Sequence, residues 1–187
     1  MEVIDIGKKG HGSRSKLTGR DRQPHPAALG KRVKPVLLYV MFGIPGSGKT
    51  TWVRRNLPES VVRVSSEPIR NRIYGGRPRR LIRSKEALVW DEVRSKLVRN
   101  LDMGNDTALD TMGLNRYMRA WIRMIADDSS RPVRLIAVFM DTPLEIAIAR
   151  NRRRKGMVPD SVVSRMAAGF EPPEKVEGFE RIVRVRP

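Results

Sequence analysis

One stretch of this chain decides its fold: Gly43-Ile44-Pro45-Gly46-Ser47-Gly48-Lys49-Thr50. It matches G-x-x-x-x-G-K-[ST], the pattern of the phosphate-binding P-loop. The apolar run at residues 36–42 predicts a strand buried on both faces, and residues 51–57 predict a helix that ends before Pro58. Strand, glycine-rich loop and helix follow one another as a P-loop requires, so the sequence predicts a nucleoside triphosphate site.

The residues of this motif have separate expected roles. Glycines allow the backbone to wrap around a phosphate with its N–H groups pointing inward, and the helix N-terminus adds partial positive charge. Lys49 is expected to reach the β- and γ-phosphates, and the Thr50 hydroxyl is expected to bind Mg²⁺. The predicted nucleotide-binding residues are Gly43, Pro45, Gly46, Ser47, Gly48, Lys49, Thr50 and Thr51.

The composition narrows the chemistry and suggests a partner. The chain has no cysteine and only two histidines, so disulfides, thiolate nucleophiles and histidine triads are excluded, and proton transfer must use carboxylates or lysine. The 38 Lys and Arg residues outnumber 20 Asp and Glu residues, and the net charge of +18 predicts a nucleic-acid partner. No apolar run is long enough to span a membrane and the N-terminus is not a signal peptide, which predicts a soluble, cytoplasmic protein.

The chain divides into a tail and one domain. Residues 1–34 are basic, lack apolar periodicity, and form either a solvated leader or a nucleic-acid-binding arm. In residues 35–187, further strands are predicted at 61–64, 107–110, 133–140 and 182–185. Helices are predicted at 81–103 with Ser84 as cap, at 115–126, at a capping box formed by residues 142–145, and after Pro159. This alternation predicts an α/β P-loop NTPase fold, a parallel sheet of about five strands with helices on both faces.

Two aspartates end predicted strands and could hold Mg²⁺ beside the P-loop. Asp110 ends the third strand and Asp141 ends the fourth. Asp141 has a competing role, because it precedes the capping box and could stabilise that helix N-terminus. Asp110 is therefore the preferred metal or substrate carboxylate.

The second strand is followed by Glu67 and Arg70, at the edge of the sheet where ligands bind. Glu67 precedes a proline, which favours an extended conformation at the mouth of the crevice, and a helix from Pro68 would carry Arg70 inward. Glu67 could accept a hydroxyl proton while Arg70 holds a neighbouring phosphate. The alternative is that both are surface residues at a helix start.

The densest cationic run extends from Arg150 to Gly156. It follows a helix that begins at the carboxyl end of the fourth strand and stops at a glycine, which favours an arginine-rich lid over the phosphoryl group. Nonspecific contact with nucleic acid is the alternative.

Several motifs together resemble phage-type polynucleotide 5′-hydroxyl kinases and the wider group of small P-loop kinases with an AAA-like ATP-binding domain. They are G-x-P-G-S-G-K-T-T-W, S-S-E-x-I-R, the D-T-x-x-L-N segment that begins at Asp110, and R-N-x-x-R followed by V-P. The resemblance implies that Lys49 and Thr50 bind ATP and Mg²⁺, and that Glu67 is the general base. It further implies that Arg70 contacts the acceptor phosphate and that Asp110 is a second active-site carboxylate. Arg150 and Arg154 would be the lid arginines.

The chain departs from this family at two places. Glu67 stands where the family has an aspartate, and Met112-Gly113 replaces polar residues after Asp110. The predicted function is an ATP-dependent phosphotransferase acting on the 5′-hydroxyl of DNA or RNA. A kinase of a nucleoside or sugar, and an ATP-binding nucleic-acid ATPase without a hydroxyl acceptor, are the alternatives. The sequence leaves the oligomeric state open.

Overall fold

A five-stranded parallel sheet forms the centre of the computed structural model, which describes residues 33–78, 80–112, 115–154 and 158–186. The predicted parallel sheet is confirmed, while the predicted tail lies almost wholly outside the described residues. The strand order is β2-β3-β1-β4-β5. The strands are β1 (Val36–Phe42), β2 (Val62–Ser65), β3 (Thr107–Asp110), β4 (Val133–Met140) and β5 (Arg181–Val185).

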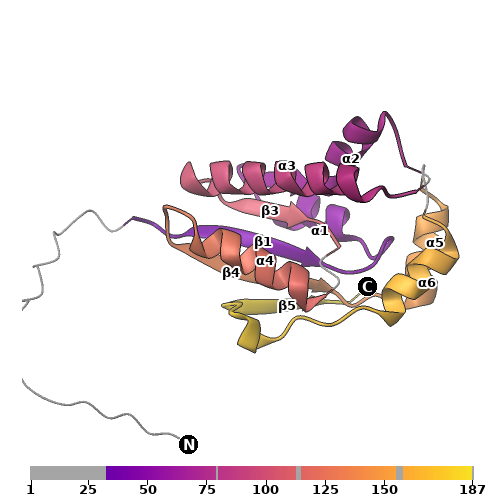
Figure 1. Ribbon diagram of the computed structural model, residues 1–187. Coiled ribbons are helices and arrows are strands. Elements are labelled where there is room, and N and C mark those ends of the chain that lie inside the picture. Colours follow the sequence, from indigo (N-terminus) through magenta and orange to yellow (C-terminus); the bar gives the residue numbers. More distant parts are fainter. Residues whose placement is uncertain (1–32, 79, 113–114, 155–157, 187) are drawn as a thin grey trace, which may run out of the picture. The chain divides into compact units, whose positions relative to one another are not determined.

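Strand β1 lies in the middle of the sheet and directs the P-loop to one edge. Leu38 pairs with Thr107 of β3 on one side and with Leu135 of β4 on the other. Because all the strands are parallel, their carboxyl ends meet at the same edge, and Figure 1 shows the arrowheads pointing toward the side that carries α5 and α6. The P-loop and the predicted acceptor residues therefore share that edge.

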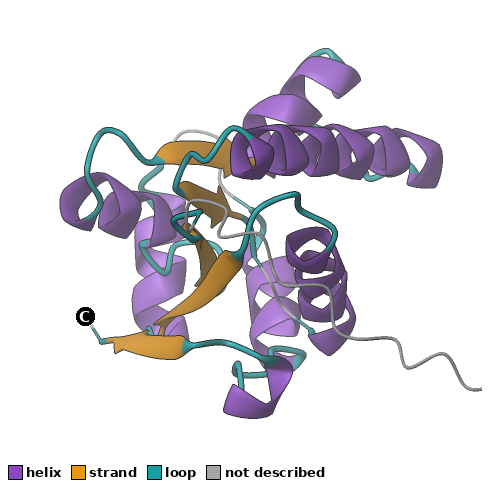
Figure 2. Cartoon of the chain, turned by 90° about the vertical axis from the view of Figure 1, so that its left-hand side faces the viewer, coloured by secondary structure: helices purple, strands orange, loops and turns teal. Residues whose placement is uncertain are grey.

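Helices cover both faces of the sheet, as predicted (Figure 2). Helix α1 (Lys49–Asn56) packs on one face, and α3 (Arg83–Asp102) and α4 (Arg116–Asp127) pack on the other. Helix α2 (Ser66–Tyr74) packs against α3. Helices α5 (Leu144–Arg152) and α6 (Asp160–Ala168) pack on each other at the carboxyl edge. A short 3₁₀ helix (Lys175–Glu177) precedes β5.

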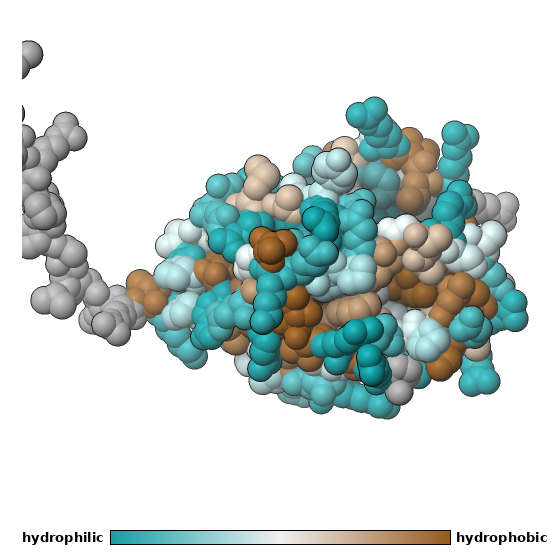
Figure 3. Space-filling model, turned by 90° about the horizontal axis from the view of Figure 1, so that it is seen from below, coloured by the Kyte–Doolittle hydropathy of each residue, from teal (hydrophilic) through white to brown (hydrophobic). Residues whose placement is uncertain are grey.

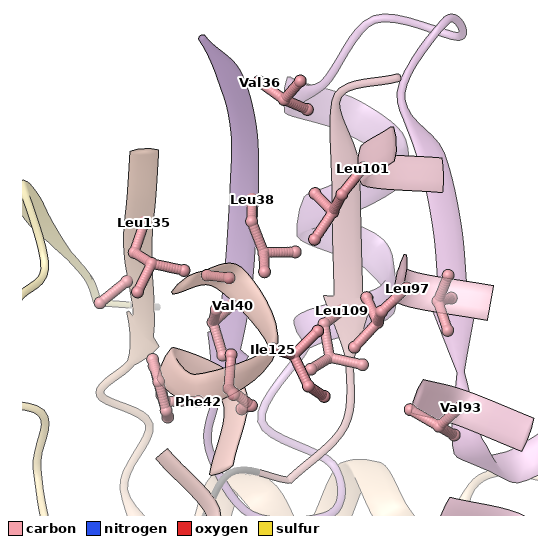
Figure 4. Close-up of a cluster of buried hydrophobic side chains, with 14 of the residues drawn as sticks. Val36, Leu38, Val40, Phe42, Val93, Leu97, Leu101, Leu109, Ile125 and Leu135 are labelled. Carbon is pink, nitrogen blue, oxygen red and sulfur yellow. The ribbon is translucent and has the colours of Figure 1, made fainter. Parts of the chain in front are cut away.

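The main core fills the space between the sheet and the α3–α4 layer (Figure 4). Alternate residues of β1 point into it, and Leu38, Val40 and Phe42 are fully buried there. They meet Leu97 of α3 and Ile125 of α4, both also buried. Tyr39 and Met41 of β1 face a second cluster against α1. This burial on both faces explains why the strand before the P-loop is almost wholly apolar.

Two predicted helix caps are wrong. Ser84 is the second residue of α3, and Ile82 occupies the N-cap position without a side-chain hydrogen bond. The capping box at residues 142–145 is not formed, because Pro143 is the N-cap of α5 and the Thr142 hydroxyl donates to the Ser47 carbonyl at 3.0 Å. In α4, by contrast, the Asn115 side chain accepts from the Met118 amide at 3.0 Å.

One face of the molecule mixes hydrophilic and hydrophobic side chains. Seen from below, teal hydrophilic side chains lie among pale and brown hydrophobic patches (Figure 3). Among the helices described in residues 33–186, none has the length and the apolar composition needed to cross a membrane.

Candidate active site

The P-loop has the backbone geometry of a phosphate cradle. Gly43, Gly46 and Gly48 have φ angles of 144°, 81° and 101°, which residues with a Cβ rarely adopt. Gly48 is also the N-cap of α1, so the first amides of this helix open toward the loop. The predicted roles of the three glycines fit this geometry.

The loop is packed tightly against α5 and its preceding segment. A Cβ on Gly46 would lie 2.1 Å from the Ala147 carbonyl oxygen, so only glycine fits there. Thr142 anchors the next residue through its hydrogen bond to the Ser47 carbonyl. The P-loop conformation therefore depends on α5, the helix that carries the predicted lid arginines.

Lys49 is the most strongly perturbed charge of the site. Its Nζ atom donates to the carbonyl oxygens of Gly43 at 2.8 Å and Ile44 at 3.0 Å. Burial lowers the pKa of Lys49 to about 8; the Asp110 carboxylate opposes this shift, Arg154 adds to it, and Glu67 opposes it weakly. Asp110, Arg154 and Glu67 thus influence the charge of the P-loop lysine.

Asp110 lies directly beside Thr50, as the predicted metal site requires. The Thr50 hydroxyl donates to Asp110 Oδ2 at 2.7 Å. The same carboxylate oxygen forms an ion pair with Arg63 Nε at 3.1 Å. Asp110 is buried, and these two donors compensate its charge.

This pair of oxygen ligands fits Mg²⁺ bound together with a nucleotide. No cluster of three or more acidic or histidine side chains that could hold a metal occurs within the described residues. Mg²⁺ is commonly held by one or two protein oxygens together with phosphates and water, so Thr50 and Asp110 suffice. The ion would neutralise charge on the β- and γ-phosphates there.

A cavity of about 390 Å³ adjoins the P-loop. Ser47 lines it, and the buried Ser47 hydroxyl has no hydrogen-bond partner among the described residues. Pro45 is buried beside the cavity-lining residues, and Thr51 forms part of the wall. The sequence did not identify the following residues as part of the wall: Trp52, Arg55, Asn56, Met140, Thr142, Val185 and Arg186.

Glu67 lies in the first turn of α2, so the predicted extended conformation is wrong. Helix α2 begins at Ser66, before the proline, because the amide that Pro68 lacks would have no intrahelical partner in a first turn. The Glu67 side chain is 55% exposed and lies 3.6 Å from Arg77 Nη1. Its carboxylate is therefore accessible to solvent.

Arg70 is held by a carboxylate that the sequence did not reveal. Its Nε and Nη2 atoms donate to Glu86 Oε1 and Oε2, both at 2.9 Å, and Nη1 lies 3.5 Å from Ser66 Oγ. Both members of this pair are largely buried. The bidentate pair with Glu86 therefore occupies two of the three guanidinium nitrogens, and Nη1 contacts Ser66.

The lid arginines come from the end of α5. Arg150 lines the cavity beside the P-loop, whereas Arg154 follows the helix and influences the charge of Lys49. Fully buried Asn151 holds the two ends of the connection together, because its amide donates to the Val158 carbonyl at 2.6 Å and its oxygen accepts from the Val158 amide at 3.1 Å. Residues 155–157, which complete the predicted lid, lie outside the described residues, as do Gly113 and Leu114.

Asp141, the rival metal carboxylate, is engaged elsewhere. Its Oδ2 atom pairs with Arg184 at 2.8 Å and with Arg186 at 3.3 Å. Asp110 is the carboxylate that contacts the P-loop threonine, which supports the preference for Asp110.

A family profile described as AAA domain matches residues 38–173, which include the P-loop, Asp110 and the lid arginines. The chain belongs to the AAA domain family. No curated protein sequence matches it. The match covers every predicted catalytic residue of this AAA domain.

Solved structures of kinases share the fold of this AAA domain. A chain of the Pnkp1/Rnl/Hen1 RNA repair complex is 17% identical with a TM-score of 0.62, and the match covers 76% of this chain and 46% of that chain. A sugar kinase from Janibacter sp. HTCC2649 is 19% identical with a TM-score of 0.57, covering 82% and 86%. The Mycobacterium tuberculosis APS kinase CysC, in complex with AMPPNP and APS, is 19% identical with a TM-score of 0.56, covering 82% and 90%. The AAA domain thus spans less than half of the RNA repair chain.

Proposed function

We propose that this protein is an ATP-dependent kinase that phosphorylates the 5′-hydroxyl of DNA or RNA. The observation that carries the proposal is the 2.7 Å hydrogen bond from the Thr50 hydroxyl to Asp110 Oδ2, which joins the P-loop to a candidate metal carboxylate at the sheet edge that also carries Glu67. A nucleotide cradle, a candidate metal carboxylate and a candidate base therefore lie at one edge of the sheet.

The proposed reaction assigns each group a step. The acceptor hydroxyl oxygen forms a bond to the γ-phosphorus, the bond from that phosphorus to the β–γ bridging oxygen breaks, and ADP leaves. Glu67 takes the hydroxyl proton, while Lys49, Arg150 and Arg154 stabilise negative charge on the transferring group. Mg²⁺ on Thr50 and Asp110 would supply further charge neutralisation.

Charge and exposure favour a polynucleotide acceptor. The net charge is +18, and exposed arginines occur both at the start of α3, at Arg80 and Arg83, and after α5, at Arg153 and Arg154. The α2–α3 connection and the end of α5 lie at the same end of the molecule (Figure 1). A phosphate backbone running past accessible Glu67 would meet arginines from both segments.

A small hydroxyl acceptor is the second candidate. The sugar kinase and the APS kinase match this chain over 86% and 90% of their own lengths, far more than the RNA repair chain does.

The two candidates are distinguished by one acceptor panel. γ-Labelled ATP is offered with 5′-hydroxyl DNA, 5′-hydroxyl RNA, their 5′-phosphorylated forms, nucleosides, sugars, or no acceptor. The proposal predicts label on the 5′-hydroxyl oligonucleotides alone. Label on a nucleoside or sugar instead would establish the second candidate, and labelled inorganic phosphate alone would establish an ATPase.

A further inference from the structure

We propose that Arg63 sets the magnesium dependence of nucleotide binding, as a positioning residue that occupies the metal carboxylate before Mg²⁺ arrives. This inference rests on the proposed function, since it requires that the P-loop bind a nucleotide with Mg²⁺. It is independent of the acceptor.

The sheet register brings Arg63 to Asp110. Arg63 of β2 pairs with Ala108 of β3, two residues before Asp110, so the two side chains project from the same face of adjacent strands. Their ion pair measures 3.1 Å, and it uses the same oxygen, Oδ2, that accepts from Thr50 at 2.7 Å. The Asp110 side chain is 5% exposed, whereas that of Arg63 is 31% exposed.

A guanidinium and a divalent cation compete for one carboxylate. Asp110 is buried and needs a positive partner when no metal is bound, and Arg63 supplies it. Mg²⁺ at Asp110 would introduce two further positive charges beside Arg63. Lys49 is a third positive group there, because the Asp110 carboxylate raises the pKa of Lys49. Metal binding must therefore weaken the Arg63–Asp110 pair, and the partly exposed Arg63 side chain has solvent to move into.

The same ion pair affects the nucleotide without metal. While Arg63 compensates Asp110, the carboxylate repels incoming phosphates less, so nucleotide can bind before the ion. Without Arg63, the bare carboxylate would repel metal-free nucleotide and attract Mg²⁺ more strongly. Arg63 thus reduces the coupling between nucleotide and metal, which is a thermodynamic quantity that binding alone can measure.

The test measures ADP affinity by calorimetry with saturating Mg²⁺ and with EDTA. The ratio of the two dissociation constants, metal-free over Mg²⁺-bound, defines the coupling. Arg63→Gln is expected to raise this ratio about fivefold or more over wild type. Arg63→Lys keeps the charge and is expected to restore part of the difference. Arg99→Gln removes an equal charge from an exposed site on α3 and is expected to leave the ratio unchanged.

A double variant separates this effect from general damage. If Arg63 acts through Asp110, Arg63→Gln will not change the ratio in an Asp110→Asn background. An unchanged or lower ratio in Arg63→Gln, with the protein folded by thermal melting, would overturn the inference while leaving the proposed kinase intact. Failure of the wild-type protein to bind ADP at all would overturn both.

Discussion

Replacing Gly46 with alanine tests how α5 shapes the P-loop. The new Cβ would lie 2.1 Å from the Ala147 carbonyl oxygen and 2.9 Å from its carbon, and both atoms are backbone. Rotation of a side chain cannot relieve this overlap, so either the loop or α5 must move. The φ angle of 81° adds strain that alanine does not tolerate well.

The expected loss of stability in Gly46→Ala follows from a matched comparison with Gly75. Gly75 has a similar φ of 71°, but an added Cβ there would meet nothing within 4 Å. Gly75→Ala should therefore lower the free energy of unfolding by about 1–2 kcal/mol through strain alone. Gly46→Ala carries the same strain and in addition an overpacking cost of about 1–3 kcal/mol, for a total of about 2–5 kcal/mol.

Denaturant unfolding and nucleotide-induced thermal shifts measure both effects. Gly46→Ala is expected to unfold at lower denaturant than Gly75→Ala and to lose most of the stabilisation by ATP, because displaced amides no longer converge on the phosphates. Gly75→Ala should keep the full nucleotide-induced shift. Equal stabilities of the two variants, with normal ATP binding by Gly46→Ala, would refute the close packing of the P-loop on α5.

Three further predictions concern the charged residues. Glu67→Gln should lower kcat about 10²–10⁴-fold without changing ATP affinity, because only proton acceptance is lost. Since burial lowers the pKa of Lys49 to about 8, ATP affinity should be constant at lower pH and fall above pH 8, by up to tenfold per pH unit. Glu86→Gln should raise the KM for an oligonucleotide about tenfold or more with little change in that for ATP, because Arg70 loses a charged partner.

Each of these predictions has a result that opposes it. Normal turnover by Glu67→Gln would transfer the role of base to Asp110. An ATP affinity that is flat to pH 10 would mean that Lys49 keeps its ordinary pKa. An equal rise in the KM values for the oligonucleotide and for ATP in Glu86→Gln would indicate general disruption of the site. Glu86 would then have no specific role in orienting Arg70.

The P-loop and the sheet were predictable because their signals are local. Eight consecutive residues specify the loop, and the apolar run before it requires a strand covered on both faces, which the structure confirms. Asp110 was predictable for a related reason. A parallel strand order brings strand ends to one edge, so a carboxylate at the end of β3 meets the first turn of α1.

The partners of these residues were not predictable, because they come from distant segments. Glu86 lies 16 residues after Arg70 on another helix, and the neighbouring sequence does not indicate that it pairs with that arginine. The predicted capping box failed because the Thr142 hydroxyl found a tertiary partner in Ser47, 95 residues away. Arg119 gave no signal either, although its side chain is fully buried against Glu177 and the Glu171 carbonyl.

Transfer of labelled phosphoryl from ATP by the wild-type protein and by Lys49→Ala tests the central claim most directly. The P-loop amides survive this substitution, but the charge that stabilises the γ-phosphoryl group is lost. We predict that wild-type protein labels a 5′-hydroxyl oligonucleotide and that folded Lys49→Ala does not. Near-normal turnover by folded Lys49→Ala, or release of inorganic phosphate alone by wild type with every acceptor, would contradict the assignment of this chain as a kinase.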